Sequence, residues 1–144
     1  MKRAGFTMIE LIFVIVILGI LSAVALPKFI GVSEQAEAAK CDSAVGTMNR
    51  TVGPALWSDS LMNGNDGKLK GGSTAPYDSA AHLATEIQKQ FTIPTKCVTS
   101  GGAITTTWLA DGNGTDVVIG GKTYVVGFTD GNSTSAAVWT WTQK

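Results

Sequence analysis

The sequence has few of the groups that carry out covalent chemistry. It contains a single histidine, His82, and two cysteines among its 144 residues. Nucleophilic catalysis needs a hydroxyl or thiol beside a base, and the sequence offers no such arrangement of cysteine and histidine. It also lacks the glycine-rich loop with which many proteins hold a nucleotide phosphate. We therefore expect a protein that is not an enzyme and has no catalytic residues.

The sequence also lacks an excess of either charge. Eleven basic side chains balance eleven acidic ones, and the pI is about 6.5. Domains that bind nucleic acid are usually strongly basic, so the composition does not indicate binding to DNA or RNA. The length allows one domain with a modest core. Seventeen glycines, together with frequent serine and threonine after residue 95, favour turns and strands in the C-terminal part.

Charge is almost absent from residues 6–27, FTMIELIFVIVILGILSAVALP, where Glu10 is the single ionisable side chain. A run of about 20 apolar residues is long enough to span a membrane. An unpaired carboxylate in hydrocarbon costs at least about 2.5–3.5 kcal/mol, so we expect Glu10 to have a partner.

Two ordinary interpretations of this run compete with a more specific one. A secretory signal peptide would use Lys2 and Arg3 as its basic region, residues 11–21 as its apolar region and the AVA sequence at 23–25 as its cleavage site. The product would be a secreted binding domain that begins after Ala25. A plain single-pass anchor would use only the length of the run. Neither interpretation gives a reason for a carboxylate near its start.

The more specific interpretation comes from the order of residues around that carboxylate. The stretch closely resembles the N-terminus of type IV pilins and type II secretion pseudopilins, whose short basic leader ends in glycine before Phe-Thr-x-Ile-Glu and a long apolar helix. The positions that match this pattern are Gly5, Phe6, Thr7, Ile9, Glu10, Gly19 and Pro27. The resemblance covers the leader and the first helix only.

The resemblance implies how such a chain is processed and assembled. A prepilin peptidase would cut between Gly5 and Phe6, and the new Phe6 amine would be methylated. Glu10 would pair with the Phe6 ammonium of a neighbouring subunit, because neither charge is easily left alone in a medium of low dielectric constant. The implied partners are further copies of the chain or minor pilins, the peptidase, an inner-membrane assembly platform and, before assembly, membrane lipid.

The expected function is therefore a structural subunit of a type IV pilus-like or type II secretion pseudopilus filament. The chain would lie in the bacterial inner membrane as a single-pass protein and then in a periplasmic or extracellular filament. The modest size of the head favours a pseudopilin slightly. A surface pilin for adhesion, motility or DNA uptake is the alternative.

Several residues should interrupt or end the long helix. Proline removes a backbone hydrogen bond, so Gly19 and Pro27 should weaken it, either as a simple kink or by loss of helicity in a filament. An amphipathic pattern then continues to Leu56, and Gly53-Pro54 should end or kink it. The expected divisions are a leader at 1–5, a membrane or filament-core helix at 6–27, its amphipathic continuation at 28–56 and a head at 57–144.

The head is expected to be α+β, with the long helix packed on a C-terminal antiparallel sheet, as in pilins. A loop at 63–77 precedes a helix from 78 or 79 to about 91. Strands are expected at 104–110, 115–119, 123–128 and 136–142, joined as a meander. Trp139 and Trp141 should share one face of the last strand, as core residues or alternatively as a binding patch.

Cys41 and Cys97 are expected to form a disulfide if the head lies outside the cytoplasm, with two buried thiols as the alternative. Cys41 falls on the apolar stripe of the long helix, where a link to the head should start. The loop closed would be worth about 4 kcal/mol in the chain-entropy model.

The loop at 111–116 allows three interpretations. Asp111, Asn113, Thr115 and Asp116 are oxygen ligands of the kind that calcium prefers, and the segment is somewhat similar to the calcium loop of major pseudopilins. A hairpin turn is the simpler interpretation. The third is a glycan, because Asn113 begins an Asn-x-Thr acceptor pattern, with similar patterns at Asn49 and Asn132. An aspartate lies two residues before Asn113 and Asn132, which resembles the extended acceptor of bacterial N-glycosylation.

Overall fold

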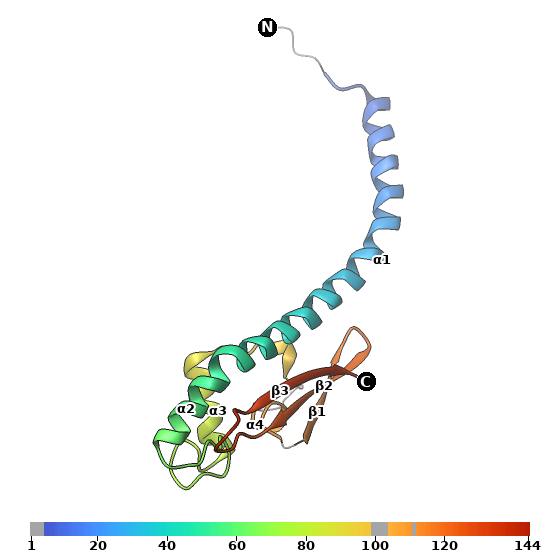
Figure 1. Cartoon of the computed structure of the whole chain (residues 1–144). Coiled ribbons are helices and arrows are strands. Elements are labelled where there is room, and N and C mark those ends of the chain that lie inside the picture. Colours follow the sequence, from blue (N-terminus) through green and yellow to red (C-terminus); the bar gives the residue numbers. More distant parts are fainter. Residues whose placement is uncertain (1–4, 99–103, 111) are drawn as a thin grey trace. The chain divides into compact units, whose positions relative to one another are not determined.

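The structure is a computed structural model that describes residues 5–98, 104–110 and 112–144. It contains two compact units, Met1–Gln35 and Ala36–Lys144. The elements in chain order are α1 (Met8–Thr47), η1 (Met48–Val52), α2 (Gly53–Met62), α3 (Ala80–Gln90), η2 (Thr95–Cys97), α4 (Ile104–Thr107), β1 (Gly112–Ile119), β2 (Lys122–Thr129) and β3 (Val138–Gln143). Figure 1 shows their course along the chain.

The long N-terminal helix is continuous from Met8 and passes Gly19 and Pro27 without a break. Proline at this position removes the hydrogen bond that the carbonyl of Ala23 would otherwise accept, yet neighbouring turns keep the helical path. The single chain is therefore helical across the segment expected to be weak. The hypothesis that this segment loses helicity inside a filament stays a prediction.

The helical path does not end at Gly53-Pro54, so the expected end there is wrong, whereas the expected kink stays a prediction. A π-helical turn, η1, comes first, and the Gly53 N–H donates to the carbonyl of Met48 five residues earlier. Pro54 then occupies the first turn of α2, where a missing N–H is tolerated, and the helix continues to Met62. Residue 53 is closely surrounded, because a Cβ there would lie 2.9 Å from the Met48 carbonyl oxygen and 3.0 Å from the Trp139 ring.

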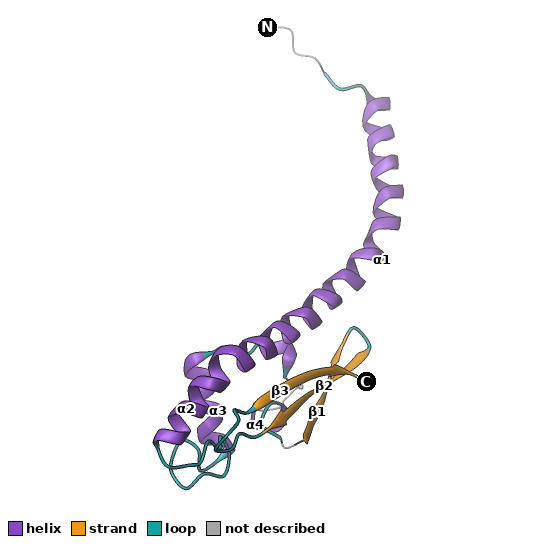
Figure 2. Ribbon diagram, in the orientation of Figure 1, coloured by secondary structure: helices purple, strands orange, loops and turns teal. Residues whose placement is uncertain are grey.

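The sheet has three antiparallel strands in the order β1-β2-β3, which Figure 2 shows as one layer. A tight turn at Gly120 and Gly121, both with positive φ, joins the first two strands. The expected strands at 115–119, 123–128 and 136–142 correspond to β1, β2 and β3. The predicted α+β class, with a long N-terminal helix and an antiparallel C-terminal sheet, is confirmed.

The expected strand at 104–110 is wrong. Residues 104–107 form the short helix α4, and the Trp108 N–H donates to the Ile104 carbonyl at 2.8 Å. The threonine run favours extended backbone by propensity, but Trp108 is fully buried and its indole donates to the Cys97 carbonyl at 2.9 Å. Burial of this large ring outweighs a local preference that spans only about 1 kcal/mol.

The core of the head lies between the helices and one face of the sheet. Trp139 is 1% exposed, so the core interpretation of this side chain is confirmed. Trp141 is half-buried and stacks on Tyr124 with ring centroids 4.9 Å apart. The helix expected from residue 78 or 79 is α3, and Ser79 caps it by accepting the His82 N–H. Buried residues contributed by the helices and the sheet are Cys41, Val45, Met48, Val52, Leu56, Leu83, Ile87, Val117, Val126 and Phe128.

Candidate functional site in the N-terminal helix

The peptide bond expected to be cut lies just outside the helix. Gly5 and Phe6 have no regular secondary structure, and Phe6 is 81% exposed. A peptidase needs an extended, accessible substrate, which a helical segment does not supply. The structure therefore presents this bond in an accessible, non-helical segment, and its cleavage stays a prediction.

Glu10 lies in the first turn of α1, next to Thr7. The Thr7 hydroxyl accepts the Glu10 N–H at 3.3 Å and donates to its carboxylate at 3.4 Å. This is a variant of the capping box, in which a hydroxyl and a carboxylate three residues apart satisfy the start of a helix. A negative charge is also favourable at this end of the helix dipole. The Thr-x-x-Glu spacing in the sequence is the pattern that predicts such a cap.

The surface of the first half of α1 is apolar and uncovered. The large apolar side chains that the structure describes between Phe6 and Val32 are exposed, for example Phe13 at 65% and Leu26 at 66%. The helix has the length and composition needed to cross a membrane. Apolar surface of this extent marks a site that contacts lipid or another protein.

Gly19 stands on this apolar surface, and apart from its own stretch of helix no described group lies within 4 Å of the position that a Cβ would occupy. The glycine is thus not required by packing within the chain. Small residues on an apolar helix let another backbone approach closely. The expected role of Gly19 in assembly stays a prediction, as does that of Pro27.

The structure contains a disulfide between Cys41 and Cys97, both fully buried. It links α1 to η2 inside the unit Ala36–Lys144, with Cα atoms 5.4 Å apart. The loop it closes is worth about 4 kcal/mol in the chain-entropy model. The disulfide thus links the C-terminal part of α1 covalently to η2.

The candidate calcium ligands are only partly assembled. Asp111 lies outside the described residues, and Asn113, Thr115 and Asp116 lie on β1, where the register shifts between Asn113 and Asp116. The Asp116 carboxylate lies 2.6 Å from the Lys144 ammonium, which would compete with a cation. Within the described ranges, no group of three or more carboxylate, histidine or cysteine side chains gathers around one point. Calcium binding stays a prediction.

Asn49 has a structural role that the sequence did not reveal. Its side-chain N–H donates to the Trp139 carbonyl at 2.7 Å, and its side-chain oxygen accepts the Trp139 N–H at 2.8 Å. The amide thus pairs with the outer edge of β3 as a neighbouring strand would. Unpaired strand edges promote association with other chains, and this one is partly covered.

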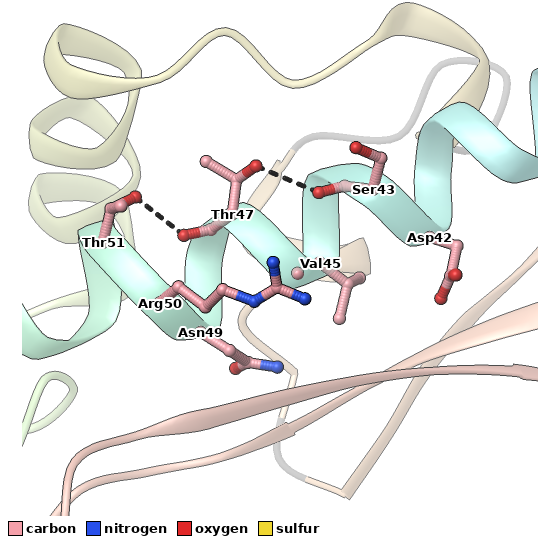
Figure 3. A pocket seen from close by; sticks show the side chains of 8 residues that line it. Asp42, Ser43, Val45, Thr47, Asn49, Arg50 and Thr51 are labelled. Carbon is pink, nitrogen blue, oxygen red and sulfur yellow. Dashed lines mark hydrogen bonds between the residues drawn. The ribbon is translucent and has the colours of Figure 1, made fainter.

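A shallow polar groove of about 500 Å³ runs along the same part of the helix (Figure 3). Two threonine hydroxyls there donate back along the helix, Thr47 to the Ser43 carbonyl and Thr51 to the Thr47 carbonyl. In Figure 3 Asn49 points towards the strands. Arg50 is exposed at the groove. This groove has no arrangement of side chains suited to catalysis.

Comparisons with known proteins agree with the features of the N-terminal helix. The prokaryotic N-terminal methylation motif matches residues 1–26. A similar protein is the type IV narrow pilus major component PilA5 of Thermus thermophilus, 46% identical over 48 residues, which are 33% of this chain and 41% of that protein. The match thus covers less than half of the relative's length. No solved structure matches the chain. Over its N-terminal third, the chain is therefore similar to a type IV pilus component, and it carries the methylation motif at its start.

Proposed function

We propose that the chain is a structural subunit of a type IV pilus-like filament, which is processed at its N-terminus and assembled through its first helix. The observation that carries the proposal is the methylation motif at residues 1–26, which continues into an exposed apolar helix. Before assembly the helix lies in the inner membrane. In the filament, the helices of other subunits cover the same apolar surface.

The N-terminal turn supplies the electrostatics of assembly in this proposal. A prepilin peptidase cuts between Gly5 and Phe6 and creates a new ammonium, which is then methylated. The Glu10 carboxylate, which Thr7 holds at the start of α1, pairs with the Phe6 ammonium of the next subunit. In low dielectric an unpaired charge is strongly unfavourable, so the pair fixes how far neighbouring helices are staggered.

A pilus and a secretion pseudopilus both assemble through an N-terminal helix of this kind, so the helix does not distinguish the two functions. The relative named a narrow pilus component favours the pilus. Imaging of surface filaments from cells with and without the gene distinguishes the two. Filaments lost with the gene support a pilus, whereas unchanged filaments with impaired protein secretion support a pseudopilus.

Intact mass of the mature protein, isolated from membranes of the source organism, tests the proposal. We expect the loss of residues 1–5 and the gain of one methyl group. Loss of residues 1–25 would instead indicate a secreted domain that is cleaved after Ala25. An unprocessed mass would indicate a plain membrane anchor, and either result would overturn the proposal.

A further inference from the structure

We propose that Asn132 is an acceptor for an N-linked glycan, transferred to its side-chain nitrogen from a lipid-diphosphate-linked oligosaccharide. Three positions carry the Asn-x-Ser/Thr acceptor pattern: Asn49, Asn113 and Asn132. Their surroundings in the fold differ, and those differences select one of them. The proposal rests on the proposed function in one respect, because it needs the head to lie outside the cytoplasm.

Asn49 is unsuited to modification in the folded unit Ala36–Lys144. Both ends of its amide are engaged with the backbone of Trp139, at 2.7 and 2.8 Å, and the residue is half-buried. A glycan on its nitrogen would break the contact with the Trp139 carbonyl. Asn113 lies within β1 and is paired with Gly127, so its backbone is held in the sheet.

Asn132 is exposed and lies outside the strands, in the connection between β2 and β3. Its side-chain oxygen accepts three hydrogen bonds, from the Thr134 N–H at 2.9 Å, the Thr134 hydroxyl at 2.8 Å and the Ser135 N–H at 3.0 Å. None of the described residues accepts a hydrogen bond from its side-chain nitrogen. The reacting atom therefore faces solvent while the oxygen of the same amide is held in place.

This arrangement suits the chemistry of transfer. An amide nitrogen becomes nucleophilic as it loses a proton, and the resulting negative charge is shared with the amide oxygen. Three donors already aimed at that oxygen stabilise such charge. The nitrogen then forms a bond to C1 of the first sugar, and the C1–oxygen bond to the lipid diphosphate breaks with its electron pair. The proton goes to a base of the transferase, and no oxidation or reduction takes place.

The connection that carries Asn132 is anchored on both sides. The Trp57 indole donates to the Asn132 carbonyl at 2.7 Å. The Asp130 carboxylate accepts the N–H groups of Leu69 at 2.7 Å and Gly131 at 2.8 Å. A fixed acceptor loop on a folded head loses less conformational entropy on entering a transferase than a disordered one.

The same contacts give a structural role to the aspartate that lies two residues before the asparagine. The pattern of an aspartate two residues before the asparagine suggested that Asp130 forms part of the signal read by a transferase. In the structure this carboxylate is half-buried and bound to backbone N–H groups, the third being that of Lys70 at 3.2 Å. Asp130 therefore builds the turn, and recognition in the folded head rests on Asn132 and Thr134.

The test uses the purified, disulfide-bonded full chain in detergent. It is incubated with a single-subunit oligosaccharyltransferase of Asn-x-Ser/Thr specificity and a lipid-diphosphate-linked oligosaccharide. Trypsin after reduction places the three candidate asparagines in separate peptides, residues 41–50, 97–122 and 123–144, because cleavage follows Lys and Arg. We expect the glycan on the peptide 123–144 alone. The free peptide 123–144 serves as the unfolded comparison.

Matched variants separate chemistry from folding. Asn132→Asp keeps the oxygen that closes the turn and removes the nitrogen, so we expect no transfer and an unchanged melting temperature. Thr134→Val should abolish transfer, Thr134→Ser should retain it, and Asn49→Asp should not affect it. Glycan on either other peptide would overturn the proposal. Modification of the free peptide without modification of the folded chain would also overturn it. So would the absence of glycan from the peptide 123–144 of the folded chain. None of these results depends on cleavage after Gly5, so the proposed function is tested separately.

Discussion

Glu10 carries the single side-chain charge between Phe6 and Pro27, and Thr7 holds it at the start of the helix. We expect Glu10→Gln to abolish incorporation into filaments, because a neutral amide cannot balance the ammonium of the next subunit. The comparison of sheared filament and membrane fractions by immunoblot measures this. Thr7→Val is the control, since it removes the capping contact but keeps the charge, and it should assemble. Wild-type incorporation of Glu10→Gln would contradict the pairing.

Tyr77 gives the head a pH dependence at the alkaline end. It is fully buried, and its pKa is raised by burial, by its hydrogen bond to Asp59 at 2.7 Å and by the charges of Asp59 and Glu86. The unfolded chain deprotonates at a pKa of about 10, whereas the folded chain keeps the proton. The contribution of Tyr77 to the free energy of unfolding should therefore be complete below pH 10 and decrease as the pH rises beyond it.

Urea unfolding between pH 8 and 11 checks this expectation on the full chain in detergent. We expect Tyr77→Phe to unfold at a lower urea concentration near neutral pH. Its free energy of unfolding should be about 1 kcal/mol smaller, because one hydrogen bond is lost. Its midpoint should change less above pH 10 than that of the wild type. Tyr124→Phe, which keeps Tyr77, should retain the wild-type slope. Parallel slopes for the wild type and Tyr77→Phe would show that another group governs the decline.

At the residue scale, the sequence predicted best those features that depend on a short continuous motif. The residues from Gly5 to Glu10 form a short motif, and both the motif and the helix that follows are found as expected. Asn49 and Asp130 were missed in their structural roles, because their partners lie far away in sequence. Asn49 contacts Trp139, and Asp130 contacts Leu69. Such pairings depend on the tertiary fold and leave no local pattern.

At the scale of elements, the loop after α2 depends on a close approach at Gly67. This glycine has a φ of 75°, and a Cβ there would collide with the Asn132 carbonyl and lie 2.5 Å from the Trp57 indole nitrogen. We expect Gly67→Ala to destabilise the head by about 2–3 kcal/mol, from backbone strain and displaced neighbours together. Gly64→Ala is the matched control, with a φ of 73° and open space around it, and should pay only the strain of about 1 kcal/mol.

Thermal and urea unfolding of both variants, measured side by side, checks this difference. Equal losses of stability would mean that the contact between the loop and the β2–β3 connection contributes little. A loss confined to Gly67→Ala, accompanied by altered Trp57 fluorescence, would agree with the structure.

The elements that the sequence failed to predict have physical reasons in common. Residues 104–110 favour a strand by their threonines, yet they form α4 because Trp108 must be buried. Gly53-Pro54 is a strong stop signal, yet the preceding π turn lets the helix continue. In both places packing against the rest of the head outweighs a local preference. The three strands were predictable because alternating apolar residues and glycine turns agree with their packing.

At the scale of the whole molecule, the core belongs to one of the two units. The buried residues that form it lie between Cys41 and Trp139, and the exposed apolar side chains from Phe6 to Val32 lie outside that range. We expect the fragment Ala36–Lys144 to fold alone, remain soluble without detergent and keep its disulfide. Sedimentation velocity should show a monomer, whereas the full chain should require detergent. Aggregation of the fragment would mean that the first unit contributes to the core.

The π turn η1 has a consequence for which changes in length the chain tolerates. A π turn is wider than an α turn, because its hydrogen bonds join residues five apart, so it holds one extra residue in about the same rotation of the helix. Cys41 and Leu56, on either side of η1, therefore both reach the core. Removing one residue from Met48–Val52 should leave a regular α-helix with these two faces still aligned. Related chains of the same architecture should therefore tolerate a difference of one residue between Cys41 and Leu56, because neither side chain would turn away from the core.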